Sequence, residues 1–269
     1  MAAMAALLAG AAPACAGRAG NADLAWRDQY LFIGDDGTVI PLVLQRTGAG
    51  AAEAKGWVGG PQGWQGRLYH RYRMASGGAA SVAKAVAALA GSPHTPVRGR
   101  LTGGDGVDLE LRLRDRVVHI VAPALQPLGR AEDPEGVSLY RAGRASLRSA
   151  GRDLAGWLVV EETPPDRPRR AFVDYGDFLF AAVATRERVL VVKRSLTRAG
   201  FDHRFALSGD RGPDLELAAA RVIDRDVTRG VNPAGDPVRF EVLLLGGDVS
   251  GVAFTIRPDG RMDPWLASH

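Results

Sequence analysis

GRASLRSAGRDLAGWLVVEETPPDRPRRAFVDYGDFLFAAVATRERVLVVKR, residues 143–194, is the stretch that decides the fold of this chain. Turn-forming residues divide it into apolar segments with the length of β-strands, each too short for a typical helix. Glu161 and Glu162 end one segment, and Asp174-Tyr175-Gly176-Asp177 lies between the next two. We therefore expect extended strands here, and we place the candidate site of the protein among the acidic residues at their ends.

Hairpin signals recur on both sides of this stretch. Asp35-Asp36-Gly37 follows the aromatic segment 26–33, and a glycine-rich turn at 103–106 precedes residues 107–114, where apolar and charged residues alternate. Glycine accepts the positive φ that tight hairpins require. Such signals at strand-length intervals predict an all-β antiparallel barrel or sandwich. The sequence shows no alternation of strands and helices, so a parallel α/β fold is disfavoured.

Three segments break the strand pattern. Residues 79–90 (AASVAKAVAALA) are rich in alanine and predict one short helix that ends at Gly91. Residues 48–63 read as a loop, and residues 128–136 (LGRAEDPEG) read as a polar linker. We therefore predict two β halves, an N-terminal domain over 21–130 and a C-terminal domain over 131–269.

Residues 1–20 predict a signal-like leader. The apolar run 4–13 is too short to cross a bilayer as a helix, and Ala12-Pro13-Ala14 and Ala14-Cys15-Ala16 both fit a small-x-small cleavage pattern. These features favour a periplasmic or secreted protein, although no basic residue precedes the apolar run. A mis-set start, a plain alanine-rich leader and, less favoured, lipid anchoring at Cys15 are the alternatives.

Composition excludes several classes. The formal charge of +4 is spread along the chain without a basic helix or an aromatic-basic sheet motif, so we predict no nucleic-acid partner. One cysteine allows no internal disulfide, and the five histidines lack metal-ligand spacing, so we predict no metal. The sequence also lacks a phosphate-binding loop, a Gly-x-Ser-x-Gly elbow and a His-Glu-x-x-His pair, and we predict no cofactor.

Carboxylates are the groups that could carry chemistry. Consecutive residues of a strand point to opposite faces, so only one of Glu161 and Glu162 can face a barrel interior. There its pKa would be raised, and it could donate a proton. Asp174 and Asp177 could supply a second carboxylate if their strand pairs with that of Glu161. The alternative is that both glutamates are solvated beside Pro164-Pro165.

Aromatic residues accompany these carboxylates. Trp157, Tyr175 and Phe178 offer flat faces for an apolar ligand or a developing cation. We therefore predict Glu161 and Asp174 as catalytic residues. The predicted ligand-binding residues are Trp157, Tyr175, Phe178 and Asp177.

The run Gly143-x-Ala-Ser-Leu-x-x-x-Gly151-Arg-x-Leu-x-Gly156-Trp157-Leu-x-x-Glu161 resembles the carotenoid 1,2-hydratase (hydroxyneurosporene synthase) and lipocalin-like superfamily. The resemblance implies two lipocalin-like β domains that act on long apolar polyenes, or catalyse cyclisations, without metal or nucleotide. It implies that Glu161 is the acid or a polar anchor and that Trp157 lines the cavity. Thr163-Pro164 stands where the family has His-Trp, a departure that concerns the hydratase chemistry more than the fold.

The leading functional hypothesis is an exported lipocalin-like protein that binds a small hydrophobic molecule in a β-barrel or an inter-domain cleft. A cofactor-free hydratase, lyase or cyclase that acts on a polyene-like substrate by acid catalysis is the second hypothesis. The third is a non-catalytic envelope protein whose faces bind other proteins. Proximity to a membrane surface, the identity of the ligand and the oligomeric state stay open.

Overall fold

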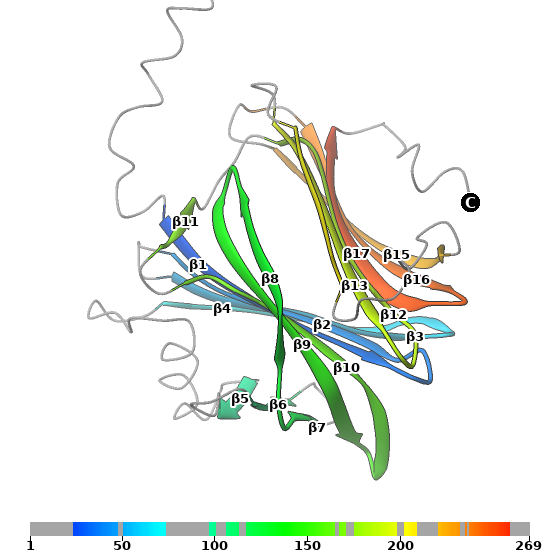
Figure 1. Ribbon diagram of the computed structural model, residues 1–269. Coiled ribbons are helices and arrows are strands. Elements are labelled where there is room, and N and C mark those ends of the chain that lie inside the picture. The colour runs from blue at the N-terminus through cyan, green and yellow to red at the C-terminus, as the bar shows by residue number, and fades with distance from the viewer. Residues whose placement is uncertain are drawn as a thin grey trace, which may run out of the picture.

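The computed structural model describes residues 24–47, 51–73, 97–100, 106–112, 117–164, 167–170, 175–197, 202–208, 220–231, 235 and 237–258. Throughout these residues the regular secondary structure is β, and every strand pairing is antiparallel (Figure 1). The predicted all-β antiparallel architecture is therefore confirmed. The helix predicted over 79–90 and the leader lie outside the described residues. Among the described residues, none belongs to a helix that is long and apolar enough to cross a membrane.

Eleven strands form a large sheet. They are β1 (Leu24–Gly34), β2 (Val39–Thr47), β3 (Ala51–Gly60), β4 (Gly63–Arg73), β5 (Val97–Arg100), β6 (Val107–Arg112), β7 (Val117–Ala122), β8 (Gln126–Asp133), β9 (Gly136–Ser149), β10 (Arg152–Glu162) and β11 (Arg169–Arg170). Their order is β4-β3-β2-β1-β10-β9-β7-β6-β5, with β11 beside β1 and β8 beside β9.

Six strands form a small sheet. They are β12 (Tyr175–Ala184), β13 (Val189–Thr197), β14 (Asp202–Ser208), β15 (Ala220–Val231), β16 (Pro237–Gly247) and β17 (Ser250–Pro258). Their order is β14-β13-β12-β17-β16-β15, so β15 and β14 are the edges of this sheet. The chain passes from the large sheet to the small one between β11 and β12.

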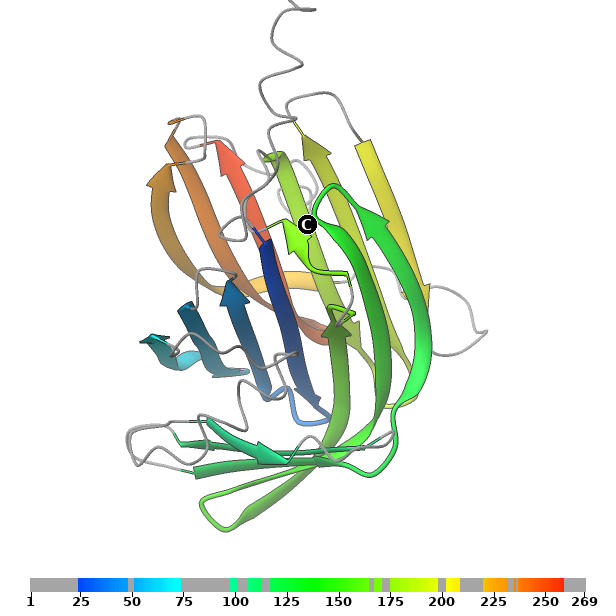
Figure 2. The ribbon, with the colours of Figure 1, turned by 90° about the vertical axis from the view of Figure 1, so that its left-hand side faces the viewer.

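Three apolar clusters hold these layers together. The middle core lies between the two sheets and contains Leu31, Val159, Phe180 and Phe254 among others. The concave core lies on the other face of the large sheet, which curls so that β5–β7 lie across one end of the molecule (Figure 2). The outer core, with Leu179 and Leu243, covers the far face of the small sheet. Both faces of β1 and β10 are therefore buried.

The β9–β10 hairpin shows why the decisive stretch folds as it does. Its two turn residues, Ala150 and Gly151, both have positive φ (49° and 78°), as a tight hairpin with the twist of its strands requires. At Gly156 a Cβ atom would lie 2.4 Å from the carbonyl oxygen of Ile33, so only glycine lets β10 approach β1 this closely. The hairpin thus places β10 at the centre of the large sheet.

Two segments differ from the sequence-based expectation. Ala51–Gly60 was expected in a loop but forms β3, because β2 and β4 pair with it on both sides. The polar stretch 128–136 was expected as a linker, but it forms the end of β8 and the turn into β9. Two of its acidic residues, Asp133 and Glu135, are buried, as described below. The predicted domain boundary near residue 130 falls within β8, and the division into two domains stays a prediction.

Candidate functional site

Alternation along β10 sorts the predicted residues onto two faces. Trp157, Val159 and Glu161 face the middle core, whereas Glu162 points toward the opposite face. Glu161 is 1% exposed, so the alternative of a solvated Glu161 is wrong. Glu162 is partly buried and accepts two hydrogen bonds from Arg141, at 2.6 and 3.1 Å. The two glutamates therefore point to opposite faces of the large sheet, as expected for consecutive residues of a strand.

Glu161 belongs to a buried ion network between the sheets. Its Oε1 atom accepts hydrogen bonds from Arg169 Nη1 at 2.5 Å and from Ser138 Oγ at 2.7 Å. Arg169 also contacts Glu135 and, at 3.5 Å, Asp133. The other two cations of the network are Lys193, which contacts Asp133, and Arg27, which lies 2.5 Å from Glu135. Three carboxylates and three cations thus balance in charge.

This balance determines the ionisation of Glu161. Burial by itself raises its pKa, but the charges of Arg169, Lys193 and Arg27 and the hydrogen bond from Ser138 outweigh burial and lower the pKa to about 2. The same cations hold the pKa of Glu135 below its usual range against the effect of burial. The expected raised pKa of Glu161 is therefore wrong, and its geometry is that of an ionised anchor.

Three of the remaining predicted residues, Tyr175, Asp177 and Phe178, belong to β12. Asp174 lies outside the described residues, and for Tyr175 and Asp177 the structure describes only the backbone, where β12 pairs irregularly with β13. Phe178 is buried in the middle core, and Lys193 Nζ lies 5.5 Å from the centre of its ring. β12 pairs with β13 and β17 and not with β10, so the strand pairing on which a second carboxylate beside Glu161 depended does not form among the described strands.

Trp157 lies at the other end of β10, near a pocket that it does not line. Its Nε1 atom donates a hydrogen bond to the carbonyl oxygen of Thr185 at 3.0 Å, and the guanidinium of Arg144 lies 5.4 Å from its ring centre. Arg144 in turn donates two hydrogen bonds to the carboxylate of Asp35, at 3.0 and 2.6 Å. Trp157 therefore supports the wall of the pocket through Arg144.

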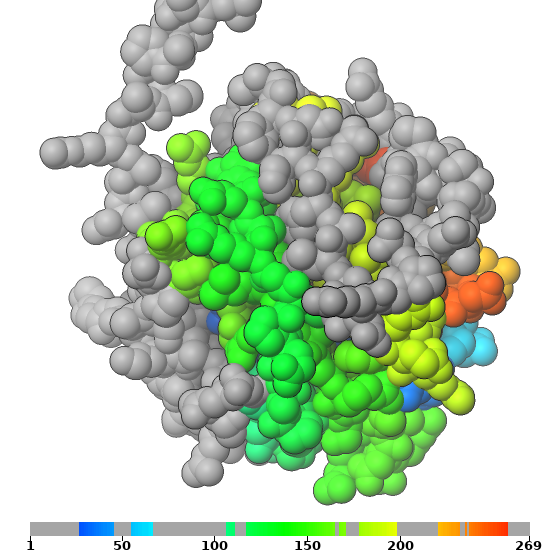
Figure 3. All heavy atoms as spheres, in the orientation of Figure 1, coloured from blue at the N-terminus to red at the C-terminus, as the bar shows by residue number. Residues whose placement is uncertain are grey.

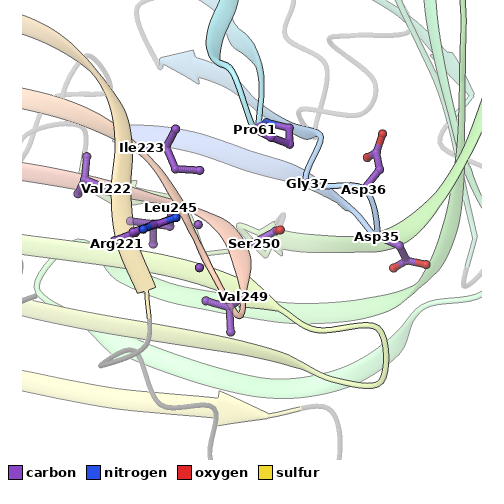
Figure 4. A pocket seen from close by; sticks show the side chains of 12 residues that line it. Asp35, Asp36, Gly37, Pro61, Arg221, Val222, Ile223, Leu245, Val249 and Ser250 are labelled. Carbon is purple, nitrogen blue, oxygen red and sulfur yellow. The ribbon is translucent and has the colours of Figure 1, made fainter.

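This junction pocket has a volume of about 680 Å³ and lies where hairpin turns of the two sheets meet. The β1–β2 turn and Pro61 contribute one side, and β15 and the β16–β17 turn contribute the other (Figure 4). Gly246 leaves room for the Ile223 side chain in this lining, because a Cβ atom there would lie 2.2 Å from Cδ1 of Ile223. Its apolar wall consists of Pro61, Val222, Ile223, Leu245 and Val249.

Three charged residues line the junction pocket, and two of them are already neutralised. Asp35 is paired with Arg144, and Asp36 accepts a hydrogen bond from the Thr38 amide at 2.9 Å and lies 3.8 Å from Arg152. No ion pair among the described residues involves Arg221. Figure 4 shows Arg221 and Ser250 entering the hollow, while the carboxylates of Asp35 and Asp36 turn away from Arg221. The pocket thus presents one cation beside an apolar wall.

A second polar group lies on the concave face of the large sheet. The side chain of Asp28 lies here, and the residue is 6% exposed. Its pKa is raised to about 7, chiefly by burial and in addition by the negative charges of Glu162 and Glu161. The hydrogen bond from the Thr163 amide and the charge of Arg141 oppose this rise. Tyr30, two residues along the same face of β1, is fully buried at its hydroxyl, which has no hydrogen-bond partner among the described residues. Burial and the nearby Asp28 charge raise the pKa of Tyr30.

The candidate residues that sequence reasoning missed gave different signals. Asp28 interrupts an aromatic strand segment, and an acidic residue inside such a run could have been singled out. Arg221 lies in a segment without a clear pattern, and Arg169 follows a proline-rich turn. Among the described residues no group of three metal-ligating side chains is close enough to hold a metal ion.

The known proteins that this chain resembles are solved structures with a similar fold. No protein-family model matches the chain, and no curated protein matches it. A crystal structure from Nitrosomonas europaea, described as a candidate AttH protein, matches with a TM-score of 0.47 at 10% identity, over 87% of this chain and 92% of that one. Kievitone hydratase from Nectria haematococca matches with a TM-score of 0.44 at 6% identity, over 87% and 89%. Matches at these identities do not indicate an activity for this chain.

Proposed function

We propose that the protein binds a small molecule with an apolar body and one anionic group in the junction pocket. The observation that carries this proposal is the pairing state of the lining charges: Asp35 and Asp36 have partners, whereas Arg221 forms no ion pair with another described residue. A volume of about 680 Å³ falls within the range of about 300–1,000 Å³ that small-molecule pockets occupy. A position between the sheets also agrees with the predicted inter-domain cleft.

Each half of such a ligand has a matching partner. A carboxylate or sulfonate can accept two parallel hydrogen bonds from the planar guanidinium of Arg221, a geometry that a neutral hydroxyl cannot reproduce. The apolar body would cover Ile223 and Val249, with a gain of roughly 25 cal/mol for each Å² removed from water. Arg221 thus supplies selectivity for an anion, and the apolar wall supplies affinity.

Octanoate is therefore expected to bind more tightly than 1-octanol, which has the same chain and no charge. The measurement is displacement of 1-anilinonaphthalene-8-sulfonate, itself an apolar anion, followed by its fluorescence. We expect about a tenfold difference in affinity between the two competitors, the equivalent of one charge-assisted contact. The Arg221→Gln variant should bind octanoate only as tightly as it binds 1-octanol.

Arg148→Gln serves as the matched control. Arg148 is an exposed arginine on β9 that pairs with Asp153, outside the pocket, and its replacement should leave both affinities unchanged. Equal displacement by octanoate and octanol, or an Arg221→Gln variant that still prefers octanoate, would refute the proposal. Export to the periplasm or beyond stays a separate proposal that depends on residues 1–20.

Acid-catalysed hydration is the second candidate function, and the Asp28–Tyr30 pair favours it. A carboxyl group with a pKa of about 7 can both donate a proton and take one up again near neutral pH, as a general acid requires. Asp28 would donate its proton to one carbon of an alkene. Water would add to the resulting cation and return a proton to the Asp28 carboxylate. The side chains of the concave core beside it are apolar.

Lycopene is a suitable polyene for testing this second function. Incubation in D₂O should give a monohydrated product with one carbon-bound deuterium, detected by mass spectrometry. The hydration rate of Asp28→Asn should be at least 100-fold lower than that of the wild type, since a general acid accelerates a reaction by about 10²–10⁴-fold. Arg221→Gln is the control, because the junction pocket is a different site. Hydration that survives in Asp28→Asn would exclude Asp28 as the acid.

A further inference from the structure

Among the described strands, β15 forms one edge of the small sheet. The only ladder that joins β15 to another described strand is its pairing with β16. The first half of β15 is fixed to the large sheet, where Asp224 accepts a hydrogen bond from the Trp64 amide at 3.0 Å and Asp226 accepts one from Trp57 Nε1 at 2.5 Å. No described strand pairs with the other side of β15, so this edge of the sheet can accept another strand.

Apolar side chains are exposed on this strand. Among the described residues, five large hydrophobic side chains are exposed, and three of them, Ile223, Val227 and Val231, belong to β15. Val227 is 40% and Val231 is 70% exposed. Scattered single apolar residues on a surface need no explanation, but their concentration on one open edge indicates a contact surface.

Arginines alternate with these valines. Arg225, Val227, Arg229 and Val231 occupy every second position of β15 and therefore share one face, which we name the Arg-Val face. Arg229 lies directly opposite Arg239 of β16, a like-charge pair across the ladder. The carboxylate closest to them is Glu241, which lies 2.5 Å from Arg239 and 3.5 Å from Arg225.

We propose that the open edge of β15 adds an extended strand of a partner protein in which acidic and apolar side chains alternate. Main-chain hydrogen bonds to the edge would give such a strand its affinity, and side chains at every second position would give it selectivity. Acidic residues opposite Arg225 and Arg229 would compensate the Arg229–Arg239 pair, and apolar residues would cover Val227 and Val231. The partner segment is thus defined by its charge pattern.

A second copy of this chain is a poorer occupant of the edge. Two antiparallel β15 strands would extend one sheet, with the Arg-Val faces of both copies on the same side. Arg225, Arg229 and Arg239 from each copy would then share that side. Like charges on adjacent strands destabilise a sheet, so the arginines act against self-association.

The test uses a dye-labelled peptide in which three Glu-Val units follow one another, with a Lys-Val peptide of equal length as the comparison. Fluorescence anisotropy should show binding of the acidic peptide and at least tenfold weaker binding of the basic one. Arg229→Glu should lower the affinity for the acidic peptide at least tenfold. Arg148→Glu, a replacement at an exposed position on β9, should leave this affinity unchanged. Hydrogen exchange of the backbone amides of 225–231 should slow when the acidic peptide binds.

Three results would overturn the proposal. The first is equal binding of the two peptides, or binding without protection of residues 225–231. The second is a dimer, by sedimentation, that Arg229→Glu dissociates, because the occupant would then be a second copy. The third is binding to phosphatidylglycerol vesicles without binding to the acidic peptide, because the face would then recognise a lipid surface.

Discussion

Replacing Arg169 with methionine is expected to lower the free energy of unfolding by about 3–5 kcal/mol, the usual loss when one partner of a buried ion pair is removed. Arg169 is 1% exposed, and its guanidinium contacts carboxylates of Glu161, Glu135 and Asp133. Without it, the three carboxylates would face only Arg27 and Lys193. One buried negative charge would be left without compensation, far from water.

Urea denaturation followed by circular dichroism measures this loss. Arg148→Met is the control, since Arg148 is exposed and its pair with Asp153 lies at the surface, where ion pairs contribute little. The double variant Arg169→Met with Glu161→Gln should recover part of the loss, because it removes the charge that Arg169 compensates. A loss below about 1 kcal/mol for Arg169→Met would show that the network is not held as described.

Replacing Asp28 with asparagine should stabilise the protein above pH 7 and leave its stability unchanged below pH 4. The pKa of Asp28 is raised from 3.8 to about 7 in the folded protein. Between these values the folded state holds more protons than the unfolded state, so the stability of the wild type falls as pH rises through that interval. Asparagine cannot ionise, and its amide oxygen can still accept the Thr163 hydrogen bond.

The size of this effect follows from the shift. Three pKa units correspond to about 4 kcal/mol, and we expect on the order of 2–4 kcal/mol at pH 8. Free energies of unfolding at pH 4, 6 and 8 for the wild type and Asp28→Asn give the comparison, with exposed Asp153→Asn as the control. If the free energies of unfolding of the wild type and Asp28→Asn differ by the same amount at all three pH values, Asp28 does not titrate in this range.

Local sequence patterns predicted much of the strand framework. The Asp-Asp-Gly turn forms the β1–β2 hairpin, the alternation from Val107 gives buried Val107 and Leu109 in β6, and alternation also separated Glu161 from Glu162. These features depend on neighbours along the chain. The prediction for 128–136 failed because the placement of Asp133 depends on Lys193, a residue 60 positions later on the other sheet.

The candidate site was less predictable for the same physical reason. The junction pocket combines turns from three hairpins, and no local pattern states which turns meet. Glu161 was identified as an inward-facing carboxylate, but its ionisation depends on Arg169 and Lys193, which reach it only after both sheets have packed. Trp157 was found near the pocket but not in it, because Arg144 lies between them.

The ion network bears on how the halves of the chain can evolve. Among the described members of the network, Lys193 alone comes from the small sheet, and its Nζ contacts Asp133 at the end of β8. The strands β8–β10 are green in Figure 1 and form much of the described surface of the face shown in Figure 3. A small sheet copied into another protein would bring a buried ammonium without its counterions. Recombination between relatives should therefore preserve these two positions together, or replace both by apolar residues at once.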